Sequence, residues 1–234
     1  MDLTAAILAG GLGTRLRGVI ADRPKVLAPV GGRPFLALLL DQLADAGIRK
    51  VVFLTRHRAE QVREAFGETY DGMRLIYAEE PSPLGTAGAV RRALPLITGS
   101  RVLLLNGDSY CDVPVDEFYE QHCRQNAGAS LALVQAPDTS RFGQIRLDGI
   151  GRVIAFEEKG QARGRGWINA GVYLIERKVL AELSVNQPLS LEHEVLPVWV
   201  SRRLVYGMEC GERFIDIGTP ESYSKAAAFF SMVQ

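Results

Sequence analysis

The residues best suited to bind phosphate lie near the start of the sequence, where residues 10–16 read GGLGTRL after an apolar run of strand length. Glycines at the end of a strand let backbone N–H groups approach an anion closely. The segment is not a dinucleotide fingerprint, because Leu16 stands where GxGxxG requires its last glycine, and no Gly-Lys-Ser/Thr follows to make a P-loop. A plain strand-to-helix turn uses the same glycines, so this loop alone leaves both interpretations open.

Two cations lie beside this loop. Arg15 is part of it, and Lys25 follows ten positions later in the segment PKVLAPV, whose prolines stiffen the chain. Only 5 of the 27 basic residues are lysines, so the position of each one is worth examining. A surface position would also suit Lys25, but its place between a proline and an apolar run makes that less favoured. A glycine loop flanked by two cations indicates a site for a polyphosphate.

Two aspartates are candidates for a metal site. Asp108 and Asp216 each follow a strand-like apolar run and precede a loop. Two carboxylates far apart in sequence can hold one Mg²⁺, which prefers oxygen ligands and keeps waters and phosphates in its shell. Taken singly, Asp108 would suit a turn and Asp216 a helix cap. Their occurrence together with the glycine loop and Lys25 favours the metal interpretation.

The elements that must position these residues alternate in the first half of the chain between buried strands and amphipathic helices. This pattern predicts a parallel sheet covered on both faces, with ligands at the carboxyl ends of its strands. We expect strands at Thr4–Ala9, Val51–Thr55, Leu75–Ala78 and Val102–Leu105, and helices at Pro34–Ala46, His57–Phe66 and Gly85–Leu96.

The second half has shorter connections, which indicate hairpins and mixed pairing. We expect strands at Ser130–Gln135, Gln144–Leu147, Val153–Phe156, Val172–Ile175, Leu204–Tyr206 and Phe214–Ile217, and helices at Arg177–Leu183, Leu191–Ser201 and Pro220–Phe230. Thr219 is a good N-cap for the last helix. With no linker or repeat in the sequence, residues 1–234 are predicted to form one α/β domain.

Composition narrows the possible partners. The 234 residues carry 27 basic and 27 acidic side chains and 47% hydrophobic residues, which is typical of a globular protein and argues against a nucleic-acid or anionic-membrane footprint. Three scattered cysteines without ligand spacing, and no signal or membrane segment, favour the cytoplasm. Nothing in the sequence decides between a monomer and a homodimer.

Several further motifs follow the glycine loop along the chain, in a definite order. Together they resemble the signature of the sugar-1-phosphate nucleotidyltransferases, also called nucleotide-sugar pyrophosphorylases. Within that family, the segments GTRLRGVIADRPKVLAPV and FIDIGTPESY are most similar to the D-glycero-D-manno-heptose 1-phosphate guanylyltransferases. The motifs are GGLGTRL and PKVLAPVGGRPFL, EPSPLGTAG at 80–88, NGD at 106–108, FEEK at 156–159, NAG at 169–171 and IDIGTP at 215–220.

The resemblance implies a fold, a reaction and a set of roles. The fold is a Rossmann-like three-layer sandwich with a mixed, mostly parallel central sheet, and its front half binds an NTP. A sugar 1-phosphate attacks the α-phosphorus of the NTP and pyrophosphate leaves. Arg15 would bind the pyrophosphate, Lys25 the α-phosphate, and Asp108 and Asp216 the Mg²⁺. The implied nucleotide-binding residues are Leu8, Ala9, Gly10, Gly11, Gly13, Thr14, Glu80, Gly85, Thr86 and Asp108.

Glu80 bears on which base is bound, since the family reads the base edge with the residue before the Pro-x-Pro-x-Gly turn. A carboxylate only accepts hydrogen bonds, and guanine offers two adjacent donors where uracil and thymine offer one N–H between two carbonyls. A bidentate contact of this kind discriminates by about 1–3 kcal/mol. We therefore expect GTP. Because Glu79 is adjacent, the register could shift by one residue, or a backbone group could read the base.

The back half is implied to bind the sugar phosphate through Gly143, Glu158, Lys159 and Asn169. An exposed charged turn would also account for Glu158 and Lys159, and a solvated loop is a better interpretation of Arg163 and Arg165 than a mobile flap. The favoured acceptor is the heptose 1-phosphate, giving GDP-heptose. Mannose 1-phosphate with GTP, or an amino-sugar phosphate with UTP, is the enzymatic alternative.

A catalytically silent, ligand-sensing subunit is the alternative outside catalysis, because this fold also serves regulatory partners. Such a subunit should have lost Arg15, Lys25 or the aspartates. All four are present here, which favours an enzyme.

Overall fold

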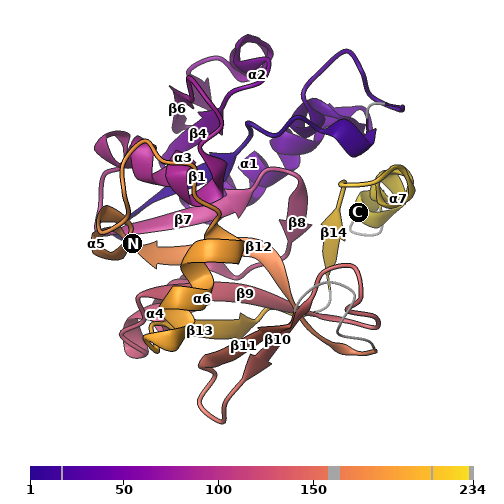
Figure 1. The fold of residues 1–234 in the computed structure, drawn as a ribbon. Helices are drawn as coiled ribbons and strands as arrows, with labels where there is room; N and C mark the ends of the chain where they lie inside the picture. Colours follow the sequence, from indigo (N-terminus) through magenta and orange to yellow (C-terminus); the bar gives the residue numbers. More distant parts are fainter. Residues whose placement is uncertain (17, 158–163, 212, 232–234) are drawn as a thin grey trace.

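The computed structural model describes residues 1–16, 18–157, 164–211 and 213–231. Its central feature is a sheet whose parallel block follows the order β7-β1-β4-β6 (Figure 1). Because these strands are parallel and in register, their carboxyl ends lie at one edge, where ligands bind in open α/β sheets. The four strands are β1 (Leu3–Leu8), β4 (Lys50–Thr55), β6 (Met73–Glu79) and β7 (Arg101–Asn106).

Antiparallel strands extend this block on the side of β7. The 11-residue strand β12 (Gly166–Glu176) runs antiparallel to β7 and also to β9 (Ala129–Ala136). The remaining strands of this sheet are β10 (Gln144–Leu147), β11 (Val153–Glu157), β13 (Val205–Glu209) and the short β5 (Thr69–Tyr70). Two small sheets pair β8 (Ser109–Cys111) with β14 (Phe214–Asp216), and β2 (Pro29–Val30) with β3 (Arg33–Pro34).

Helices cover both faces of the sheet, which confirms the predicted three-layer α/β sandwich. The helices fall into two groups, and each group contributes residues to a different hydrophobic core cluster. The first group is α1 (Phe35–Asp45), α2 (Ala59–Phe66), α4 (Val115–Arg124) and α7 (Pro220–Ser231). The second is α3 (Gly85–Ala93), α5 (Arg177–Ala181) and α6 (Leu196–Ser201), which follows a π-helical segment at Leu191–Val195.

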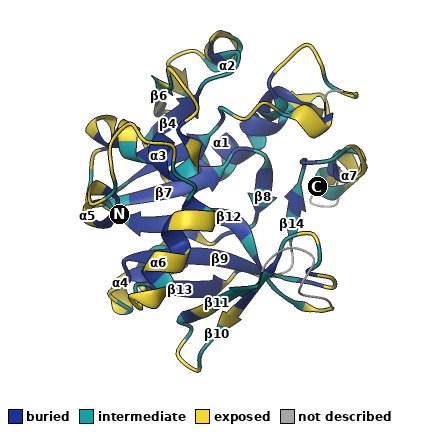
Figure 2. Ribbon diagram, viewed as in Figure 1, coloured by how far each residue is buried: buried dark blue, intermediate teal, exposed yellow. Residues whose placement is uncertain are grey.

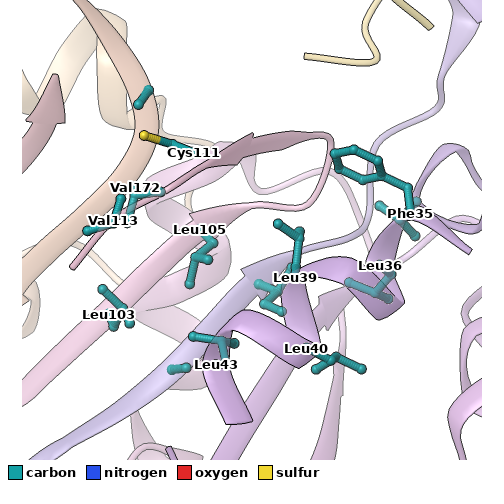
Figure 3. Packing of buried hydrophobic residues seen from close by; sticks show 14 of the residues in the cluster. Phe35, Leu36, Leu39, Leu40, Leu43, Leu103, Leu105, Cys111, Val113 and Val172 are labelled. Atoms are coloured by element: carbon teal, nitrogen blue, oxygen red, sulfur yellow. The ribbon is translucent and has the colours of Figure 1, made fainter. Parts of the chain in front are cut away.

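The central strands are apolar on both faces because both faces are covered. In β1, Ala5 and Ile7 belong to one core cluster, whereas Ala6 belongs to the other. Figure 2 shows the resulting pattern, with buried strands in the middle and exposed residues on helices and loops. Figure 3 shows leucines of α1 packed beside Leu103 and Leu105 of β7.

Some elements differ from the sequence prediction. The helix α4 and the short strand β8 were not predicted, because α4 buries only Val115, Phe118 and His122 and is otherwise highly polar. Strand β12 is much longer than the expected Val172–Ile175, since its first half also pairs with β9 across a register shift. The predicted N-cap of the last helix is confirmed, as the Thr219 hydroxyl accepts the backbone N–H of Ser222 at 3.2 Å.

Candidate functional site

A cavity of about 450 Å³ lies at the carboxyl edge of β1, β4, β6 and β7. Its wall combines segments that are more than two hundred residues apart in sequence, from the glycine loop to Gly218. Most of the residues predicted to bind a nucleotide meet here. They are Leu8, Gly10, Gly11, Gly13, Thr14, Arg15, Lys25, Glu80, Gly85, Thr86 and Asp108.

The glycine loop leaves β1 at the floor of this cavity. The backbone N–H of Ala9 donates to the carbonyl of Leu54 at 2.9 Å, so the loop stays fastened to the sheet. Gly13 has φ +56°, and a Cβ there would lie 3.2 Å from the Cβ of Lys25, so glycine allows that lysine to approach. Ala9 is 2% exposed and does not line the cavity.

The two predicted phosphate-binding cations converge at one end of the cavity. A Cβ at Gly218 would lie 3.6 Å from Lys25 Nζ and 3.8 Å from Arg15 Nη2. Lys25 also forms an ion pair with Asp108, with the lysine side chain only 12% exposed. Two cations thus lie together beside the glycine loop, where a polyphosphate would need positive charge.

Asp216 is brought next to Asp108 by the small sheet. Asp216 of β14 pairs with Ser109 of β8, and the backbone N–H of Ile217 donates to the carbonyl of Asp108 at 2.9 Å. One Asp216 oxygen, Oδ1, accepts the backbone N–H of Gly218 at 2.9 Å. The backbones of these two aspartates, 108 residues apart in sequence, therefore lie side by side, and the metal role of their side chains stays a prediction.

The donor set fits a magnesium ion that also takes substrate ligands. Each carboxylate already attracts a cation of this chain, since Lys25 contacts Asp108 and Arg141 contacts Asp216 at 3.1 Å. Over the described part of the chain, no group of three or more His, Cys, Asp or Glu side chains forms a site that could hold a metal without further ligands. Two carboxylates suit Mg²⁺, which completes its shell with water and phosphate oxygens.

Glu80 lies in the wall of the cavity just beyond β6. Its backbone N–H donates to Thr55 at 2.9 Å, and its Oε2 accepts the backbone N–H of Leu84 at 3.1 Å. Burial raises the pKa of this half-buried carboxyl, although Leu84 and nearby Arg56 act in the opposite direction. The neighbouring Glu79 is exposed and does not line the cavity, so the register places Glu80 at the site.

Gly85 and Gly88 are required for a reason that the sequence did not reveal. Gly85 has φ +68°, and a Cβ there would lie 2.6 Å from the carbonyl oxygen of Leu189. A Cβ at Gly88 would lie 2.6 Å from the carbonyl oxygen of Gln187. Both glycines therefore let α3 pack against the backbone of residues 187–189, while Gly85 also lines the cavity.

A hydrogen-bonded chain links the cavity to the predicted sugar-binding Asn169. The Thr86 hydroxyl donates to Glu192 at 3.0 Å, and the buried Tyr173 hydroxyl donates to the other Glu192 oxygen at 2.8 Å. The Asn169 amide donates to Tyr173 at 2.8 Å, and its carbonyl accepts the N–H of Gly171 at 2.9 Å. Asn169 does not line the cavity itself, but its amide is held in one orientation.

Sequence reasoning missed several residues in the cavity wall, notably Arg56, Asn106 and Glu192. Position after a strand could have indicated Arg56, which follows β4 directly. Nothing in the segment LSLEHEV distinguishes Glu192 from Glu194, whose carboxylate instead accepts the backbone N–H of Ser190 at 2.7 Å.

The structure describes only some of the residues predicted to bind the acceptor. Gly143 has φ +80° and donates its backbone N–H to Thr139 at 2.9 Å, but it does not line the 450 Å³ cavity. Glu158, Lys159 and Arg163 lie outside the described residues.

None of the helices in the described part of the chain is long and apolar enough to span a membrane.

Comparisons with known proteins agree with this geometry. A family model described as "Nucleotidyl transferase" matches residues 4–232. The chain is 36% identical over 224 residues to a D-glycero-alpha-D-manno-heptose 1-phosphate guanylyltransferase of Aneurinibacillus thermoaerophilus, covering 96% of each chain. It is 33% identical to the mannose-1-phosphate guanylyltransferase catalytic subunit beta of Drosophila melanogaster, covering 94% of this chain but 60% of that protein.

A solved structure is also closely similar. HddC from Yersinia pseudotuberculosis, complexed with GMP-PN, has a TM-score of 0.85 and 30% sequence identity, with 98% of this chain and 100% of that chain covered.

Proposed function

The chain belongs to the nucleotidyl transferase family, and on that premise we propose that it is a sugar-1-phosphate guanylyltransferase. An oxygen of the sugar 1-phosphate attacks the α-phosphorus of GTP, the bond to the β-phosphate breaks, and pyrophosphate leaves with those electrons. Such reactions need little covalent chemistry from the protein, which must position the reactants and neutralise charge.

One observation carries this proposal: Arg15 and Lys25 meet beside Gly218 at one end of a cavity that also contains Glu80. The cations would hold the phosphates, with Lys25 on the α-phosphate and Arg15 on the departing pyrophosphate. Because Lys25 is paired with Asp108, its ammonium would exchange that carboxylate for the α-phosphate. Leu8, Gly10, Gly11, Gly13 and Thr14 would supply backbone contacts to the nucleotide, together with the backbone of Ala9.

Asp108 and Asp216 would hold a Mg²⁺ ion, which when bound supplies charge neutralisation of the phosphate oxygens. Their side-by-side position and oxygen donors support this role. By holding that ion, the two carboxylates would fix the triphosphate end of the nucleotide relative to Lys25, whereas without a cation they would repel it.

Guanine recognition is assigned to Glu80. One of its oxygens accepts a hydrogen bond from the backbone N–H of Leu84. The carboxylate retains further acceptor capacity for the N1–H and 2-amino donors of guanine. Partial burial strengthens such hydrogen bonds relative to those in water. Gly85 and Thr86 form the adjoining wall and would contact the base and ribose.

Residues 1–234 would act as one domain, with the front half holding GTP and the back half holding the acceptor through Gly143, Glu158, Lys159 and Asn169. D-glycero-α-D-manno-heptose 1-phosphate is the proposed acceptor, which would give GDP-heptose in the cytoplasm. The match over nearly the full length of a heptose 1-phosphate guanylyltransferase supports this choice over mannose 1-phosphate, whose enzyme above is considerably longer.

The experiment is a pyrophosphate-release assay with purified protein and Mg²⁺, crossing four NTPs with heptose, mannose, glucose and N-acetylglucosamine 1-phosphates. We expect the highest kcat/KM for GTP with the heptose. Preference for mannose 1-phosphate would change the acceptor only, whereas preference for UTP would contradict the assignment of Glu80. Absence of pyrophosphate release in every combination would favour a ligand-sensing subunit.

A further inference from the structure

Arg141 connects the loop that precedes β10 to the carboxylate of Asp216. Its guanidinium lies 3.1 Å from Asp216 Oδ2 and 3.4 Å from Oδ1, so it contacts both oxygens of this side chain. The Asp216 side chain is 16% exposed. The oxygens that a metal ion would need are therefore covered by a cation of the protein.

The position of Arg141 is fixed by more than this ion pair. Its guanidinium carbon lies 5.0 Å from the centre of the Phe142 ring, and Phe142 packs edge-on against Phe214 at 5.6 Å. The backbone N–H groups of Phe142 and Gly143 both donate to the Thr139 carbonyl. The loop and β14 thus meet through two neighbouring contacts, one ionic and one aromatic.

We propose that Arg141 competes with the divalent cation for Asp216 and keeps the metal site closed until the nucleotide brings the metal. This inference rests on the proposed function, in which Asp216 is a metal ligand. The guanidinium occupies acceptor sites on both carboxylate oxygens, and its positive charge 3.1 Å away repels a dication at the same carboxylate.

Space exists for the displaced side chain. Arg141, Phe142 and Asp216 line a second cavity of about 700 Å³ between the loop, β14 and α7. This cavity lies directly beside the guanidinium and would be the space for it once it leaves Asp216.

The test measures Mn²⁺ binding to the full chain without nucleotide, by the electron paramagnetic resonance signal of free Mn²⁺. Arg141→Met should tighten Mn²⁺ binding by roughly 1.5- to fivefold, the range expected for loss of one partly exposed ion pair. Arg141→Lys keeps the charge and should bind more weakly than Arg141→Met. In the Asp216→Asn background, adding Arg141→Met should no longer tighten binding, because the shared carboxylate is gone.

Arg213 provides a matched control. It pairs with Asp112 at 3.2 Å and lies 4.7 Å from the centre of the Phe229 ring, which reproduces the chemistry of Arg141 at a different carboxylate. Arg213→Met should leave Mn²⁺ binding unchanged, and thermal unfolding checks that each variant is folded.

Two results would overturn the inference. Equal Mn²⁺ affinity in the folded Arg141→Met variant and the wild type would show that Arg141 does not compete, while the proposed function would stand. If Asp216→Asn alone left Mn²⁺ affinity unchanged, the metal assignment would fail and this inference with it.

Discussion

Lys25 and Asp108 form an ion pair across 83 residues of sequence, and both line the same cavity. The Lys25 side chain is only 12% exposed in the folded chain, whereas the Asp108 side chain is 38% exposed. The pair brings together one group proposed for the α-phosphate and one proposed for the metal. In the proposed reaction these two opposite charges would separate, with Lys25 on the α-phosphate and Asp108 on the metal.

Replacement of Lys25 tests the first of these roles. Lys25→Ala should lower kcat for pyrophosphate release by about 10²–10³-fold, the usual effect of removing one group that stabilises transition-state charge. Lys225→Ala is the control, because that lysine forms an exposed ion pair with Glu221 on α7 and should leave kcat unchanged. Undiminished turnover in Lys25→Ala would contradict the assignment of Lys25 to the α-phosphate.

The metal role of Asp108 predicts a different result. Loss of a residue that only supports a metal ligand commonly weakens metal affinity by about 10- to 100-fold, so Asp108→Asn should raise the Mg²⁺ concentration for half-maximal rate at least that much. Asp112→Asn removes a carboxylate that pairs with Arg213 and should not alter the Mg²⁺ titration. A titration curve for Asp108→Asn identical to that of the wild type would exclude Asp108 as a ligand.

Many of the predicted site residues line one cavity because several follow directly on strands. Asp108 lies just beyond β7 and Glu80 just beyond β6, and parallel strands carry such residues to one edge of the sheet. The family resemblance and the alternation of apolar runs were enough to predict the three layers. The N-cap at Thr219 needed only the local preference of threonine.

Other contacts depend on packing between segments that local patterns do not connect. The partners of Glu192 are Thr86 and Tyr173, which reach it from α3 and β12. Arg141 meets Asp216 only because the loop before β10 packs on β14. Such pairs have no sequence spacing of their own, so neither Glu192 nor Arg141 could be recognised before the structure was known.

Base selection should change when Glu80 is altered. Glu80→Gln replaces an acceptor-only group with one donor and one acceptor, a pattern that suits uracil better than guanine. Discrimination for GTP over UTP should fall by about 1–3 kcal/mol, or roughly 5- to 150-fold in the ratio of kcat/KM. Glu79→Gln alters an exposed carboxylate outside the cavity and should keep the wild-type ratio. An unchanged ratio in Glu80→Gln would show that another group reads the base.

Substitutions at Gly85 and Gly11 should distinguish an effect on the stability of the fold from an effect on GTP binding. Gly85→Ala introduces a Cβ 2.6 Å from the Leu189 carbonyl oxygen at φ +68°, so we expect destabilisation of about 1–3 kcal/mol, measured by chemical denaturation. A Cβ at Gly11 meets nothing within 4 Å, so Gly11→Ala should retain stability while weakening GTP binding in the cavity. Equal stability of the two variants would mean that residues 187–189 move away from α3 at little cost.

His122 predicts how stability depends on pH. Its Nδ1 lies 2.8 Å from the Ser130 hydroxyl and its Nε2 lies 3.3 Å from Glu176, which in turn pairs with Arg101 at 2.7 Å. Burial lowers the pKa of this imidazole, with Arg101 acting in the same direction and Glu176 in the opposite one. Below the ordinary histidine pKa of about 6.5, the unfolded chain therefore binds a proton that the folded chain does not.

The free energy of unfolding should consequently fall as pH decreases below about 6.5 and continue to fall until the lowered pKa of folded His122 is reached. One proton contributes a slope of at most about 1.4 kcal/mol per pH unit. Urea unfolding between pH 7 and pH 5 measures this slope. His122→Gln should remove the His122 part of it, whereas His193→Gln, at an exposed residue, should not. An equal slope in His122→Gln and the wild type would mean that His122 is protonated equally in both states, because only a difference in bound protons makes stability depend on pH.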